Sequence, residues 1–157
     1  MKYAFDPERD LLLEREVDIS RSLLWRGWTE PELLKQWFTP TPWRTTECVI
    51  DLRPGGAFHT VMEGPDGAGE CVDGCYLEVV PQERLIFTDA LGPGYRPSAR
   101  PFMTAIVTFD DLGNGRTRYT AHVRHKSAAD RETHEKMGFH DGWGKAFDQL
   151  VALANTL

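Results

Sequence analysis

Alternating apolar and polar residues predict a run of β-strands over residues 45–125. Apolar side chains recur there with a period of two, and the expected strands cover residues 48–52, 58–62, 71–80, 85–90, 103–109 and 119–123. Most of the connections are short and rich in Gly, Pro, Asn or Asp, the residues that favour turns. Six strands joined in this way predict an antiparallel meander. One further strand, residues 11–19, precedes it.

Two short helices are expected between the first strand and the meander. Ser20 is a candidate N-cap for a helix over residues 21–25, because its hydroxyl can accept from the first free backbone N–H groups. Thr29 is a candidate cap for the second helix, which has Pro31 in its first turn. Pro40 and Pro42 end this segment.

The C-terminal 30 residues or so change to a helical period, with apolar residues every three or four positions. We expect one long amphipathic helix over about residues 128–154, with Ser127 as its cap. Three glycines, Gly138, Gly142 and Gly144, interrupt the pattern, and each costs about 1 kcal/mol relative to alanine inside a helix. Their presence predicts a bend or a close approach by another group.

These elements predict an α+β fold in which the long helix buries its apolar stripe on the concave face of a curved antiparallel sheet. The length of 157 residues, without repeats or linkers, suits a single domain over residues 1–157. The net charge is −6 and the 18 basic residues are scattered, which argues against nucleic acid or an anionic membrane as partner. No apolar run is long enough for a membrane span or a signal peptide, so we expect a cytoplasmic protein.

Strand parity and the helical stripe point one set of large apolar residues toward a common space. The set contains Phe58, Met62, Phe87, Met103 and Tyr119 from the strands, with Met137, Trp143 and Phe147 from the helix. Such a stripe often forms a solid core. Methionines and aromatic residues together also suit the wall of an adaptable ligand pocket. Both interpretations remain open at this point.

Polar residues on the same strand faces are candidates for anchoring a ligand head group. Asp73 and His125 have the parity of this apolar face, where an unpaired carboxylate would be costly. The alternative is that Asp73 is solvated at a strand end and that His125 caps or orients the long helix. Asp89 shares the parity of Phe87. His134 and His140 are six residues apart and do not share a helix face, while His59 and His122 are expected to point outward.

Motifs for catalysis or cofactor binding are missing from the sequence, including GxSxG, HExxH, the P-loop and the dinucleotide fingerprint. We therefore expect no catalytic residue and no cofactor. Cys48, Cys71 and Cys75 are expected to be reduced and free of metal, because their spacing is not that of a zinc knuckle and no secretory signal precedes them.

Several segments, in this order, resemble the helix-grip fold of the START and birch-pollen-allergen superfamily (SRPBCC). They are closer still to its subgroup related to the activator of the ninety-kilodalton heat-shock-protein ATPase. The segments are SRSLLW at residues 20–25, WTEP at 28–31, DLRPGGAF at 51–58, GCYLEVVP at 74–81, ERLIFT at 83–88, GRT at 115–117 and GW at 142–143. Together they extend over nearly the whole chain.

The resemblance implies a fold and a cavity but no particular reaction, because the group includes ligand-binding proteins, cyclases and co-chaperone domains. Three functions follow as hypotheses. The first is non-catalytic binding of a small hydrophobic or amphipathic ligand. The second is an enzyme of the cyclase or hydrolase type that uses Asp73 and His125 as acid and base. The third is a stress-response module that contacts a chaperone. The eukaryotic co-chaperones carry an additional N-terminal domain, for which we expect no room here.

Overall fold

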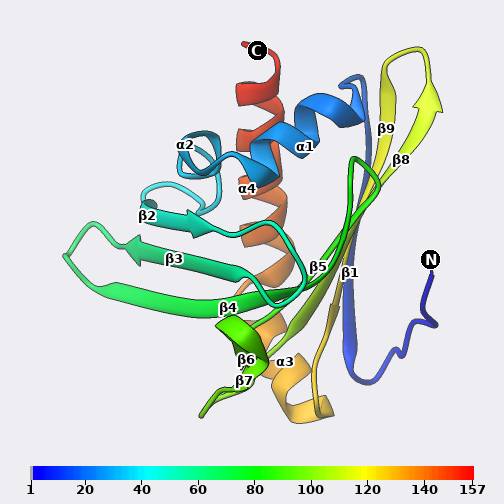
Figure 1. Cartoon of the computed structure of the whole chain (residues 1–157). Helices are drawn as coiled ribbons and strands as arrows, with labels where there is room; N and C mark the ends of the chain where they lie inside the picture. The colour runs from blue at the N-terminus through cyan, green and yellow to red at the C-terminus, as the bar shows by residue number, and fades with distance from the viewer. Residues whose placement is uncertain (1) are drawn as a thin grey trace.

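Seven strands form one antiparallel sheet in the computed structural model, which describes residues 2–157. In chain order they are β1 (Asp10–Val17), β2 (Arg44–Ile50), β3 (Ala57–Glu63), β4 (Gly69–Val80), β5 (Arg84–Thr88), β8 (Thr104–Gly113) and β9 (Arg116–Arg124). Their order across the sheet is β1-β9-β8-β5-β4-β3-β2. The predicted meander is therefore confirmed, and β1 extends it by pairing with β9 (Figure 1).

The connection after β5, a stretch rich in Gly and Pro, contains a small hairpin. It consists of β6 (Leu91–Gly92), the single 3-10 turn η1 (Pro93–Tyr95) and β7 (Arg96–Pro97). Both β6 and η1 contact β4. The end of this connection is tied back to β5, since the Asp89 carboxylate accepts from the backbone N–H groups of Phe102 at 2.8 Å and Met103 at 3.0 Å.

The two expected helices between β1 and β2 are present as α1 (Arg21–Thr29) and α2 (Pro31–Leu34). Ser20 occupies the N-cap position of α1 as expected, but its side chain makes no capping hydrogen bond, and Pro31 begins α2 as expected. The prediction that Thr29 caps α2 is wrong, because α1 runs on to Thr29, whose hydroxyl donates to the Trp25 carbonyl at 2.7 Å. The longer α1 buries Trp28 in the core.

The C-terminal segment forms two helices, α3 (Ala128–Lys136) and α4 (Phe139–Ala154), and the prediction of one continuous helix is wrong. Gly138 lies between them in the left-handed conformation, with φ 92° and ψ 41°, which glycine adopts at little cost. The predicted bend is therefore present, and it is sharp enough to separate the two helices. Ser127 caps α3 as expected, since its side chain accepts from the Asp130 backbone N–H at 3.1 Å.

Helix α4 lies along the concave side of the curved sheet, as the helix-grip arrangement requires (Figure 1). Its buried residues include Phe147 and Leu150, and Gly27 of α1 lies so close to Leu150 that a Cβ would come within 2.4 Å of that side chain. Burying a side chain the size of Leu or Phe contributes roughly 1.5–3 kcal/mol, so the packing of Phe147 and Leu150 stabilises this arrangement. Among residues 2–157, no helix is long and apolar enough to cross a bilayer.

A buried polar pair, His122 and Asp10, lies on the convex face of the sheet near its β1 edge. His122 points outward from the sheet as predicted, yet it is buried, because Phe5 covers it with ring centroids 5.7 Å apart. Its Nε2 lies 2.7 Å from Oδ2 of the buried Asp10. This contact gives His122 Nε2 and Asp10 Oδ2 a polar partner, whereas the buried Asp10 Oδ1 has no hydrogen-bond partner among residues 2–157.

Candidate functional site

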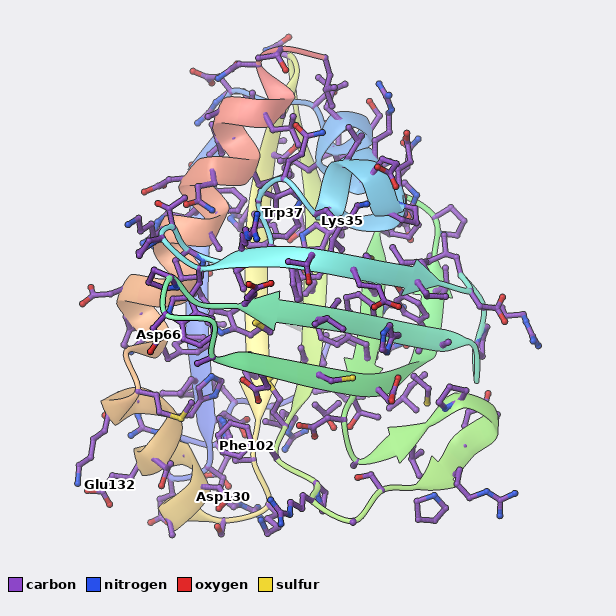
Figure 2. All side chains as sticks on the ribbon, turned by 90° about the vertical axis from the view of Figure 1, so that its left-hand side faces the viewer. Lys35, Trp37, Asp66, Phe102, Asp130 and Glu132 are labelled. Atoms are coloured by element: carbon purple, nitrogen blue, oxygen red, sulfur yellow. The ribbon has the colours of Figure 1, made fainter. Side chains whose placement is uncertain are left out.

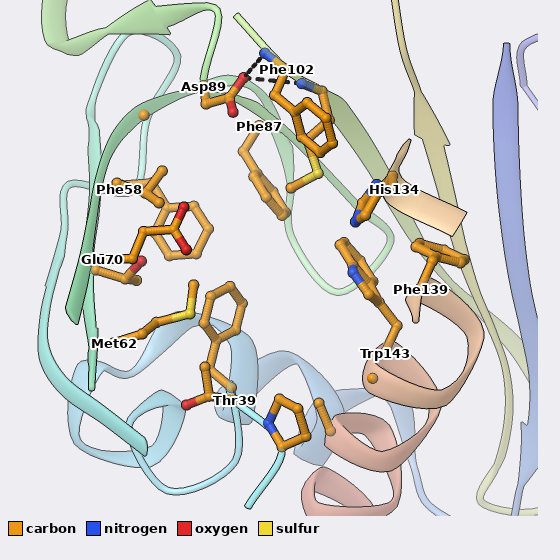
Figure 3. Close-up of a pocket in the computed structure, with 18 of the residues that line it drawn as sticks. Thr39, Phe58, Met62, Glu70, Phe87, Asp89, Phe102, His134, Phe139 and Trp143 are labelled. Carbon is orange, nitrogen blue, oxygen red and sulfur yellow. Dashed lines mark hydrogen bonds between the residues drawn. The ribbon is translucent and has the colours of Figure 1, made fainter. Parts of the chain in front are cut away.

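A cavity of about 340 Å³ lies between the concave face of the sheet, α4 and the segment that follows α2 (Figure 3). Ligand pockets in proteins typically have about 300–1,000 Å³, so this volume can hold a small organic molecule. Both Trp37 and Phe102 line the cavity, and Figure 2 shows Trp37 near β2 and Phe102 beside α3. Glu70 and Met137 are lining residues that are exposed to solvent, so they mark its mouth.

Seven of the ten residues predicted from the sequence as ligand contacts line this one cavity. They are Phe58, Met62, Phe87, Met103, Tyr119, Met137 and Trp143. The strand residues come together because residues two apart on one strand share a face, and β3, β5, β8 and β9 run side by side or nearly so. The other three predicted residues, Asp73, His125 and Phe147, lie outside the cavity.

Phe147 belongs to the core behind the wall and does not reach the cavity. Its ring stacks on that of Tyr119, with centroids 4.2 Å apart and planes 21° apart. Tyr119 lies between Phe147 and the cavity. Burial raises the pKa of Tyr119 well above its usual value, so its hydroxyl stays protonated.

The expectation that Asp73 points into the cavity is wrong, because its carboxylate lies on the outer face of the sheet with 66% of the side chain exposed. In the first half of β4 the residues that line the cavity are Glu70, Val72 and Gly74. A β-bulge follows, where the register with β5 shifts between Tyr76 and Glu78. The prediction carried one alternation through residues 71–80, but a bulge exchanges the two faces of a strand.

Asp73 is part of a small polar cluster with His59 and Cys71 on the outer face of β3 and β4. The Asp73 Oδ1 atom lies 2.5 Å from His59 Nδ1, and the candidate ligand atoms of the three residues lie within 4.8 Å of one another. Burial and the neighbouring Asp73 raise the pKa of the Cys71 thiol, which disfavours the thiolate that binds metals. His59 and Asp73 are hydrogen-bonded directly to each other. That the cluster binds no metal remains a prediction.

His125 lies behind the cavity wall, where it is fully engaged by two hydrogen bonds. Its Nδ1 atom lies 2.8 Å from the Arg9 carbonyl, and its Nε2 atom lies 2.9 Å from Nδ1 of His134. The structure therefore favours the alternative in which His125 orients the helical segment, here α3. Because Asp73 lies on the outer face of the sheet, Asp73 and His125 do not form an acid and base pair in this cavity.

His134 was not predicted as a cavity residue, yet it lines the cavity directly (Figure 3). It is 8% exposed and is surrounded by Phe102, Phe139 and Trp143, with ring centroids 5.0, 5.1 and 6.3 Å away. Burial and, secondarily, His125 lower the pKa of His134 to about 4, so the imidazole is neutral at neutral pH. Its position three residues before Met137 was the signal that could have identified it.

Asp89 and Glu70 are the two carboxylates of the wall. Asp89 was noted for sharing the parity of Phe87, and it does line the cavity. Its Oδ1 accepts two backbone hydrogen bonds, so the side chain is held in place. Glu70 was not predicted, because the expected strand began at residue 71, whereas β4 begins at Gly69. Figure 3 shows Glu70 and Asp89 on the sheet side of the cavity and His134 on the helix side.

Comparisons with known proteins agree with this fold. A protein from Nitrosomonas europaea of known crystal structure is 48% identical, covers 97% of each chain and superposes with a TM-score of 0.93. A crystal structure from Mycobacterium smegmatis is 27% identical over 93% of this chain and 90% of that one, with a TM-score of 0.76. A solution structure from Arthrobacter aurescens, 23% identical over 96% and 88%, shares the fold with a TM-score of 0.81. Curated proteins give no match.

The family comparison identifies the sequence more narrowly than the fold does. The model of one family matches residues 18–155, from the end of β1 to the end of α4. This range contains every segment on which the resemblance in the sequence rests. The chain belongs to the family of activator of Hsp90 ATPase homolog 1-like proteins.

Proposed function

We propose that this protein binds a small hydrophobic or amphipathic molecule in the cavity between its sheet and α4. The observation that carries the proposal is the cavity of about 340 Å³ itself, whose wall is rich in aromatic and methionine side chains. A solid core would leave few voids larger than a water molecule. A cavity of this size with a few polar groups is instead typical of a ligand site.

Binding without catalysis fits the polar groups of the wall better than an enzyme does. Asp73 and His125, the acid and base of the enzyme hypothesis, lie on the outer face and behind the wall. Asp89 is engaged by two backbone N–H groups. General acid–base catalysis requires groups within reach of the substrate. The arrangement supports recognition of a ligand more than turnover.

A contact with a chaperone is a second candidate, and it rests on the family to which the chain belongs. Partly exposed apolar side chains, such as Val49 on β2 and Tyr95 on η1, offer surface for such a contact. Single exposed apolar residues are common on protein surfaces, so they favour this candidate only weakly. A role in a cytoplasmic stress response would belong to this second proposal.

A titration with N-phenyl-1-naphthylamine, an uncharged apolar fluorophore, tests the binding proposal. Trp28, Trp37 and Trp143 line the cavity, so a bound probe should quench tryptophan emission by energy transfer while its own emission increases. We expect saturable binding with one probe per chain, checked by calorimetry. Absence of saturable binding, with a stable chaperone complex present instead, would favour the second candidate.

A further inference from the structure

The ionisable groups that face the cavity are acidic or neutral. Glu70 and Asp89 contribute two carboxylates, and His134 contributes an imidazole that burial keeps neutral. Among residues 2–157, the residues that line the cavity include neither lysine nor arginine. A ligand in the cavity therefore finds no cation to pair with.

The hydrogen bonds behind His134 determine which of its two ring nitrogens carries the proton. The Arg9 carbonyl can only accept, so His125 Nδ1, 2.8 Å away, carries a proton. In neutral His125 the Nε2 atom is then a bare acceptor, and His134 Nδ1, 2.9 Å away, must donate to it. Neutral His134 has only one N–H, so its Nε2 is left as a hydrogen-bond acceptor at the cavity wall.

The hydrogen-bond donors in the wall are uncharged, so they add no positive charge to the cavity. The indole N–H of Trp37 already donates to the Gly27 carbonyl at 2.9 Å. The Thr88 hydroxyl donates to the Met103 carbonyl at 3.0 Å. Trp143, Thr60 and Tyr119 can each donate to a neutral oxygen or nitrogen, but none supplies positive charge.

We infer that the ligand is an apolar molecule with a hydroxyl or amino head group, and that carboxylates, sulfonates and phosphates are excluded from this cavity. The inference rests on the proposed function and specifies its ligand class. Such a head group can donate to His134 Nε2 or to the carboxylates of Glu70 and Asp89. An anionic head group would lose its hydration beside two carboxylates of the same charge, with no cationic side chain in the wall to compensate.

Two matched fluorophores test this inference. N-phenyl-1-naphthylamine and 8-anilino-1-naphthalenesulfonate share the same ring system, and the second adds a sulfonate. We expect the uncharged probe to bind at least about tenfold more tightly at low salt, because repulsion between like charges is large at a partly buried site. Equal or tighter binding of the sulfonate in the cavity would overturn the inference while leaving the proposed function intact. Failure of both probes to bind would overturn the proposed function and the inference together.

The sulfonate adds both charge and bulk to the probe, and a charge-removing variant shows which of the two weakens binding. Glu70→Gln with Asp89→Asn removes both charges, and Asn at position 89 keeps the carbonyl oxygen that accepts from Phe102 and Met103. We expect this double variant to reduce the preference for the uncharged probe several-fold. Glu8→Gln, an exposed change outside the cavity, is the matched control and should leave the preference as it is. A preference unchanged in the double variant would show that bulk, not charge, excludes the anion, and would overturn the inference.

Discussion

His134 Nδ1 lies 2.9 Å from His125 Nε2, and this pair connects the cavity wall to the backbone of the N-terminal segment. We predict that His134 is the Nδ1–H tautomer and that it titrates near pH 4, because burial disfavours the imidazolium. Nitrogen-15 chemical shifts of the imidazole rings, followed from pH 7 to pH 4, report both properties. Titration of His134 near the usual value of 6.5 would contradict the neutral, buried assignment.

The same pKa makes stability depend on pH in a defined window. Because the pKa of His134 is lowered on folding, the unfolded chain takes up a proton first as the pH falls below about 6.5. The free energy of unfolding is therefore unaffected by this group above about pH 6.5 and falls progressively toward pH 4, by about 3 kcal/mol in total. Denaturant unfolding of the wild type and His134→Gln at pH 7 and pH 4.5 measures this difference. An equal loss of stability in both proteins would show that other groups cause the acid sensitivity.

Gly138 and Gly142 provide a matched pair for the break between α3 and α4. A Cβ would meet no atom within 4 Å at either position, but only Gly138 has a positive φ. We predict that Gly138→Ala lowers the free energy of unfolding by about 1–2 kcal/mol through backbone strain. Gly142→Ala should raise it by up to about 1 kcal/mol through helix propensity. Thermal unfolding with both variants tests the pair, and loss of stability of the same size in both would contradict the backbone explanation.

The cluster of His59, Cys71 and Asp73 leads to a prediction about metals and thiols. We expect purified protein to contain no stoichiometric zinc, because the Cys71 thiol stays protonated beside Asp73. Cys48, Cys71 and Cys75 are unbridged in the structure, and peptide mapping without reductant should recover all three as thiols. Metal analysis of the wild type and of Cys71→Ser is the measurement. Zinc that is present in the wild type and lost in the variant would contradict the prediction.

The strand order and the position of the helices were predictable because their signals are local. Turn residues and a period of two define the meander, and the helical period identifies the segment that must cover it. The face of a single residue was predictable where its strand is regular, as for Phe58 and Met62 on β3. The prediction of the face failed for Asp73, because the bulge in β4 depends on pairing with β5 and leaves no local sign in the sequence.

Helix periodicity places His134 on the same face as Met137, but it does not reveal the hydrogen-bond partners of His134. Its partner His125 lies at the end of β9, and the third member of the chain is the Arg9 carbonyl, so the arrangement exists only after long-range packing. The break at Gly138 also separates the phase of α3 from that of α4. A continuous helix over residues 128–154 therefore gives wrong faces for one of its halves.

Replacement of Met103 measures most directly whether the cavity is a binding site. Its side chain lines the cavity, whereas its backbone makes the hydrogen bonds to Asp89 and Thr88, so a substitution leaves those bonds in place. Met103→Trp should weaken binding of N-phenyl-1-naphthylamine by at least about tenfold by occupying part of the volume. Met103→Leu, which nearly conserves volume, is the control and should bind as the wild type does.

Calorimetric titration of the three proteins, with circular dichroism to verify the fold, is the decisive measurement. If the cavity is a binding site, the wild type and Met103→Leu bind the probe saturably and a folded Met103→Trp binds it much more weakly. A solid core would give no binding to any of them, and Met103→Trp would then be destabilised by about 1–3 kcal/mol through overpacking. That result would contradict the binding proposal.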